Sequence, residues 1–124
     1  MKLYIDDIRP APEGWMQARN VTDAIKTIAR FGEEITDISL DHDISLSVIV
    51  DGIQRPFPSP ETFQAVAYYM VHRWHKDVYG RKDKPNVIIH TANPVGGKEL
   101  SLILEDFNIT ITPESRVNRL ESEV

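Results

Sequence analysis

Two hydrophobic patterns alternate along this chain. Short β-prone apolar runs predict five strands, over residues 2–8, 15–19, 35–40, 85–91 and 108–112. Apolar side chains at helical spacing predict three helices, over residues 21–31, 59–80 and 99–107. Because strands that alternate with helices form right-handed crossovers, we expect a mainly parallel sheet with helices on both faces. The predicted class is α/β, a small flavodoxin-like sheet of five strands.

Two segments interrupt this alternation. Residues 9–15, RPAPEGW, contain two prolines and a glycine, so a loop replaces the helix that would join the first two strands. Asp51 and Gly52 lie between two β-prone runs, and this dipeptide favours a tight hairpin turn. We therefore expect a protruding hairpin insertion over residues 46–58. With a polar C-terminal tail, residues 113–124, these segments complete a single domain of residues 1–124.

Capping residues predict where the helices begin and end. Asn20 or Thr22 is expected to cap the first helix, and Gly32 to end it. Residues 59–61, Ser-Pro-Glu, combine a cap, a proline at the first helical position and an acid near the positive end of the dipole. We expect the second helix to begin there and to end at Gly80.

Composition narrows the class of protein. With 124 residues, 41% hydrophobic and 27% charged, the chain has the balance of one soluble globular domain. It contains no cysteine, so it has no disulfide and no thiolate metal ligand. The N-terminal residues soon become acidic, and no window approaches the roughly 18 apolar residues of a membrane helix. We expect a cytoplasmic protein with no membrane partner, and the sequence does not indicate its oligomeric state.

The net charge of −5 argues against a generic nucleic-acid coat, because such proteins bind phosphates through Lys and Arg. A site for one phosphate remains possible, since a bound cation or a few donors suffice to hold it. The net charge therefore argues against general nucleic-acid binding but allows a phosphate-containing small molecule or an RNA end as the partner.

Polar groups follow the predicted strands at one end. Because parallel strands place like ends together, ligands in such sheets bind outside the carboxyl ends. The first, third and fourth strands deliver the groups that we expect at this rim: Asp6, Asp7, Asp41, His42, Asp43, His90, Thr91 and Asn93.

Three of these acids suit a metal ion. Asp6, Asp7 and Asp41 on adjacent strands would repel one another in a partly dry cleft, which raises a pKa or requires a cation. Carboxylate oxygens are the ligands that Mg²⁺ prefers, and Mg²⁺ commonly bridges to phosphate. The alternative is that the acids are structural, with Asp7 capping the following turn and Asp43 capping the hairpin.

His42 and His90 are candidates for acid–base catalysis, because imidazole titrates near neutrality and one ring can accept a proton while the other donates one. A single histidine after an apolar strand is more often a hydrogen-bonded core residue. We assign no role to His72 and His75. A zinc site fits less well, since no histidine pair has the spacing of a zincin.

Phosphate donors are predicted nearby, and Thr91 and Asn93 are among them. Residues 93–98, NPVGGK, form a turn before the third helix, where the N–H groups of Gly96 and Gly97, together with Lys98, can bind an anion. Arg9 and Arg19 can make planar contacts to phosphate, and surface ion pairs are the alternative for both.

The motifs "YIDDIRPAPEGW", "AR", "ISLDHD" and "IHTANPVG" occur in an order that resembles cyclic-phosphate processing receiver domains, a branch of the response-regulator receivers. The resemblance covers most of the chain, apart from the hairpin and the tail. It implies a receiver-like fold and a role in handling cyclic phosphate ends of RNA or related nucleotides. By position, Asp6, Asp7 and Asp41 match the metal and phosphoacceptor acids of receivers. His42 and His90 match the histidines that distinguish this branch. Arg9 and Asn93 belong to the surrounding motif.

One departure bears on the mechanism. Receivers place a lysine at the end of the fifth strand, where this chain has Thr112 and Pro113. This argues against an ordinary aspartyl-phosphate switch.

Two functions follow as hypotheses. The first is a cyclic phosphodiesterase, with Mg²⁺ on the three aspartates, Asp41, His42 and His90 as catalytic residues, and Asp43 and Arg19 in secondary roles. The alternative is a non-catalytic module that binds metal and phosphate, or accepts phosphate on Asp41.

Overall fold

The computed structural model describes residues 1–75 and 84–113, and five parallel strands form its sheet. The strand order is β2-β1-β3-β6-β7. Their bounds are β1 (Lys2–Ile5), β2 (Met16–Ala18), β3 (Asp37–Leu40), β6 (Asn86–Ile89) and β7 (Ile109–Ile111). A loop joins β1 to β2 without a helix, so the predicted parallel sheet and its loop connection are both confirmed.

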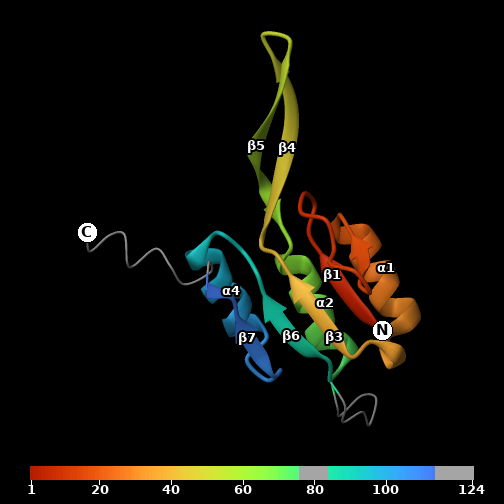
Figure 1. The fold of residues 1–124 in the computed structure, drawn as a ribbon. Helices are drawn as coiled ribbons and strands as arrows, with labels where there is room; N and C mark the ends of the chain where they lie inside the picture. Colours follow the sequence, from red (N-terminus) through yellow and green to blue (C-terminus); the bar gives the residue numbers. More distant parts are fainter. Residues whose placement is uncertain (76–83, 114–124) are drawn as a thin grey trace.

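Three α-helices cover one face of the sheet. They are α1 (Val21–Phe31), α2 (Gln64–Arg73) and α4 (Pro94–Ile103), with a short 3-10 turn, η1 (Gly32–Glu34), after α1. Because α2 packs against both α1 and α4, the three helices form one layer behind the sheet in Figure 1. We predicted helices on both faces, and in the described part of the chain this is wrong.

Side chains of the strands alternate between the two faces as the pleat requires. Leu3, Ile38 and Val87 point toward the helices and are fully or almost fully buried. On the opposite face, Tyr4 and Ile88 remain half-exposed. The hydrophobic core therefore lies between the sheet and the helix layer.

The hairpin is longer than predicted. It comprises β4 (Asp43–Val50) and β5 (Ile53–Thr62) and projects from the end of the sheet as a narrow arm (Figure 1). The turn residues Asp51 and Gly52 both have positive φ, 52° and 76°, which is the type I′ geometry expected for this dipeptide.

Helix boundaries were predicted with mixed success. Asn20 caps α1 by accepting the N–H of Asp23 at 2.7 Å, as predicted. Residues 59–61 belong to β5 instead of starting a helix, so α2 begins at Gln64 without a side-chain cap. Gly80, the predicted end of that helix, lies outside the described residues.

The last helix begins earlier than predicted. Asn93 caps α4 by accepting the N–H of Gly96 at 3.1 Å, and Pro94 occupies the first helical turn. Residues 94–98 are therefore helical, and the turn that we predicted over residues 93–98 is wrong. The predicted tail beyond residue 113 lies outside the described residues.

Candidate active site at the carboxyl ends of the strands

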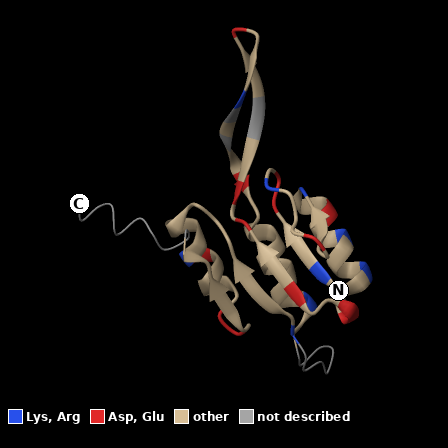
Figure 2. Ribbon diagram, in the orientation of Figure 1, with Lys and Arg blue, Asp and Glu red and all other residues tan. Residues whose placement is uncertain are grey.

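Three aspartates meet beyond the carboxyl ends of β1 and β3. The sheet ladder continues past both strands, since Asp41 N–H donates to Ile5 O at 3.0 Å and holds the two chain ends side by side. One carboxylate oxygen from each of Asp6, Asp7 and Asp41 lies within 4.8 Å of the other two. Figure 2 shows acidic residues gathered where the hairpin joins the sheet. The predicted acid cluster is therefore present.

These acids line a small cavity. Its volume is about 220 Å³, and the chemically important lining residues are Asp6, Asp7, Arg9, Asp41, Asp43 and Thr91. Ser45 and Ala92, which the sequence did not single out, also line it. Ser45 belongs to β4, and its N–H donates to Asp7 Oδ2 at 2.7 Å, so the base of the hairpin forms part of the cavity wall.

The pKa values of the two buried carboxylates, Asp6 and Asp41, are shifted in opposite directions. Burial alone would raise the pKa of Asp6, but hydrogen bonds from the His90 ring and from the N–H groups of Ile8 and Arg9 lower it below the ordinary 3.8. For Asp41, burial and then the charge of Asp6 raise the pKa above 3.8. Hydrogen bonds to Asp41 from the His42 N–H and from Thr91 lower its pKa by less than burial and Asp6 raise it. The folded protein thus disfavours negative charge on Asp41.

His90 holds Asp6 from the side of the sheet that faces away from the helices. Its Nε2 lies 3.0 Å from Asp6 Oδ2 and its Nδ1 lies 2.7 Å from Ser39 Oγ. The ring stacks on Tyr4 with centroids 4.5 Å apart and an interplanar angle of 10°. His90 is 6% exposed and is not among the residues that line the cavity. Its ring is hydrogen-bonded to the acid cluster at Asp6.

His42 lies in a second network. Its Nδ1 is 2.7 Å from Asp43 Oδ1, and its Nε2 is 2.9 Å from the Gln64 side-chain nitrogen. Gln64 also donates to Glu99 on α4 at 3.0 Å. His42 is 5% exposed and does not line the cavity, but Asp43 does. The two histidines that we expected to act together therefore lie in separate networks, each reaching the cavity through a carboxylate.

Of the predicted phosphate donors, Arg9 and Thr91 line the cavity, whereas Arg19 is not among its lining residues. Arg9 lines the cavity, donates to His90 O at 2.7 Å and lies 3.5 Å from Asp6 Oδ2. Thr91 also lines the cavity, and its side chain hydrogen-bonds Asp41. Arg19 donates instead to backbone carbonyls of the β1–β2 loop, at 3.3 Å from Asp7 O. Arg19 therefore contacts that loop and is not among the residues that line the cavity.

The remaining predicted phosphate donors lie on α4 or at its N-cap. Asn93 donates to Asp43 Oδ1 at 3.2 Å. The N–H groups of Gly96 and Gly97, which we expected to bind an anion, already donate to Asn93. Gly96 instead allows close packing, because a Cβ there would lie 2.5 Å from His42 Cγ. Lys98 is exposed on the helix and is not among the cavity-lining residues.

Sequence reasoning missed Ser39, Gln64 and Glu99. Ser39 begins the SLDHD motif, and its alternation with Leu40 places it on the same side of the sheet as Asp41. That signal was available. Gln64 and Glu99 come from different helices, and no local pattern connects them to His42.

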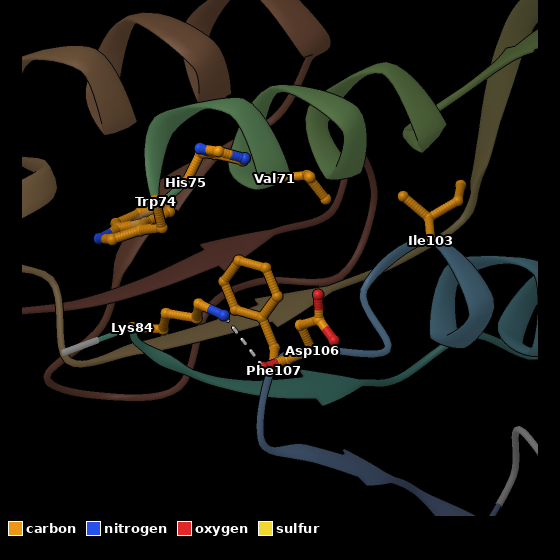
Figure 3. A pocket seen from close by; sticks show the side chains of 7 residues that line it. All are labelled: Val71, Trp74, His75, Lys84, Ile103, Asp106 and Phe107. Atoms are coloured by element: carbon orange, nitrogen blue, oxygen red, sulfur yellow. Dashed lines mark hydrogen bonds between the residues drawn. The ribbon is translucent and has the colours of Figure 1, made fainter. Parts of the chain in front are cut away.

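A larger cavity, of about 420 Å³, lies beside the amino ends of β6 and β7 (Figure 3). Trp74, Lys84 and Phe107 line it, and Lys84 Nζ donates to Asp106 O at 3.3 Å. Residues 76–83, which join two of its lining residues, lie outside the described chain. We therefore assign no ligand to this cavity.

The fold and the acid cavity together define a receiver-like α/β domain. The family model described as the cyclic-phosphate processing receiver domain matches residues 1–106. The chain therefore belongs to the cyclic-phosphate processing receiver domain family, as its motifs predicted. The matched range includes the hairpin, which the motifs had placed outside the resemblance. Searches of curated proteins and of solved structures found no match. No described helix is long and apolar enough to cross a membrane.

Proposed function

We propose that this domain hydrolyses cyclic phosphate esters with the help of a divalent metal ion. The substrate class is a 2′,3′-cyclic phosphate at an RNA end or on a related nucleotide, met in the cytoplasm. One observation carries the proposal: Asp6, Asp7 and Asp41 bring three hard oxygen ligands within 4.8 Å of one another beside a cavity of about 220 Å³.

The chemistry of the donors fits Mg²⁺. The ligands would be Asp6, Asp7 and Asp41. The pKa of Asp41 is raised by burial and then by the charge of Asp6, and a bound cation would favour the ionised carboxylate. When bound, Mg²⁺ supplies Lewis-acid polarisation of a phosphoryl oxygen. In the same cavity, Arg9 provides a cationic donor for the phosphate and Thr91 a hydroxyl.

The histidines act through carboxylates in this proposal. Hydrolysis forms a bond from a water oxygen to phosphorus and breaks one ring P–O bond, so the water loses a proton and the leaving oxygen gains one. Asp43 lines the cavity with His42 hydrogen-bonded behind it, and this pair can accept and return the proton. His90 fixes the orientation of the Asp6 carboxylate, as partners of metal ligands commonly do.

The direct test is hydrolysis of nucleoside 2′,3′-cyclic phosphates, with Mg²⁺ and with a chelator. We expect turnover that requires Mg²⁺ and falls sharply in Asp41→Asn, His42→Ala and His90→Ala. His72→Ala, an exposed histidine on α2, is the matched control and should retain full activity. Unchanged hydrolysis in both His42→Ala and His90→Ala would refute the proposed roles of the two networks.

A second candidate is a binding or signalling module without turnover. It is favoured by Asp41, which lines the cavity beside Thr91 where a receiver would accept phosphate. Incubation with a small phosphodonor and Mg²⁺ separates the two functions. A stable mass gain that disappears in Asp41→Asn would support the switch, whereas product release without an adduct would support the hydrolase.

A further inference from the structure

The hairpin forms a sheet of its own, separate from the central one. Only β4 and β5 pair in it, so each has an outer edge beside which the described chain places no strand. An isolated two-stranded hairpin is marginally stable in water and gains stability from further strands. The arm projects away from the domain, where another chain can reach it (Figure 1). The two outer edges therefore decide what the arm can bind.

The type I′ turn fixes which backbone groups face outward. With a two-residue loop, Val50 and Ile53 exchange both ladder hydrogen bonds, and every second pair along the ladder does the same. In the intervening pairs the N–H and C=O groups point to the outer edges. Ser45 lies in such a pair, and its N–H indeed donates away from β5, to Asp7 Oδ2.

The two edges differ in their donors. The intervening positions on β5 include Pro56 and Pro58, which pair with Ser47 and Ser45. Proline has no N–H, so this edge cannot complete a ladder with another strand. The corresponding positions on β4 include Ser47 and Ile49, which keep their N–H groups. One edge is therefore blocked, and the edge of β4 is open to pairing.

The open edge is uncharged and apolar. Residues 44–50, ISLSVIV, carry no charge although the chain has a net charge of −5. Val48 and Ile49 are 41% and 73% exposed. An uncharged strand can pair with a copy of itself without like-charge repulsion, whereas it offers no ion pair to a charged peptide.

We propose that β4 pairs antiparallel with β4 of a second copy, so that the two hairpins form one four-stranded sheet around a two-fold axis. Antiparallel pairing of identical strands gives a self-complementary interface, which is the usual arrangement in homodimers. The proline edges of β5 then lie on both outer sides of the sheet and prevent further growth. The assembly stops at two copies. This inference does not depend on catalysis.

A matched pair of substitutions tests the proposal, because Ile49 and Gln54 face each other across the hairpin. Ile49→Pro removes an outward N–H from the open edge, and Gln54→Pro removes one from the blocked edge. Neither change removes a hydrogen bond between β4 and β5. Sedimentation equilibrium of the full chain should show a dimer for the wild type and for Gln54→Pro. Ile49→Pro should weaken association by about tenfold or more, or ~1.4 kcal/mol.

Ile49→Lys and Gln54→Lys repeat the comparison without proline and should give the same order of association, with circular dichroism as the check of folding. A wild-type chain that stays monomeric at high micromolar concentration would overturn the proposal, as would equal effects at the two positions. A monomer that instead pairs with an added extended peptide would also overturn it, in favour of a foreign strand.

Discussion

Gly96 offers a test of how His42 is held, because a side chain at this position would collide with the imidazole. An ideal Cβ on Gly96 lies 2.5 Å from His42 Cγ and closer still to Nδ1. The ring is almost buried and is hydrogen-bonded to Asp43 and Gln64, so it cannot easily move aside. Overpacking of this kind costs about 1–3 kcal/mol. In the opposite direction, alanine is favoured over glycine inside a helix by about 1 kcal/mol.

The balance predicts that Gly96→Ala lowers the free energy of unfolding by about 0–2 kcal/mol. In a His42→Ala background the collision disappears, and the same change should stabilise the protein by about 1 kcal/mol. Urea unfolding of the four proteins then gives a coupling energy between the two positions of about 1–3 kcal/mol. If Gly96→Ala stabilises both backgrounds equally, the His42 ring does not pack against α4, and our description of its network is wrong.

Three further predictions concern the acids and His90. In metal-free buffer at neutral pH, Asp41→Asn should raise the Tm, because burial and the charge of Asp6 disfavour the negative charge of Asp41. The same substitution should abolish the Tm increase on adding Mg²⁺. A metal-free Tm lower than that of the wild type would contradict this prediction. Asp6 has a lowered pKa, so its contribution to stability is complete above pH 3.8 and is lost as the pH falls through the folded-state pKa. Acid titration of the unfolding free energy should therefore be flatter for Asp6→Asn, and an unchanged slope would argue against this assignment. Ser39→Ala should cost about 1–3 kcal/mol in urea unfolding, because His90 Nδ1 loses its buried partner. Ser101→Ala, which removes a solvent-exposed hydrogen bond to Lys98 O, should cost much less, and equal costs would refute the role of Ser39.

The fold could be predicted where local signals agreed. In α1, a capping asparagine and apolar spacing both indicated the same helix, and it spans the predicted residues. Residues 59–61 carry a helix-start signal, yet they extend β5, whose Thr62 pairs with Asp43. Pairing between distant residues outweighed the local preference there. The absence of helices from one face of the described sheet could not be predicted from strand hydrophobicity alone.

In the candidate site, too, some residues could be placed from local sequence signals and others could not. The acid cluster follows from strand ends alone, because parallel strands end at one edge. The position of His90 follows from alternation, since Ile89 points toward the helices and the next side chain points away from them. His42 required knowledge of tertiary packing, because Gln64 and Gly96 approach it from two different helices.

The chain enters and leaves the hairpin at neighbouring points. Phe63 N–H donates to His42 O at 2.8 Å, and Asp43 pairs with Thr62, so the base of the arm is closed before either strand extends outward. Strand pairs can therefore be added or deleted beyond Ser45 without displacing the aspartates. The tip at Asp51 and Gly52 is therefore a suitable insertion point for a fluorescent reporter.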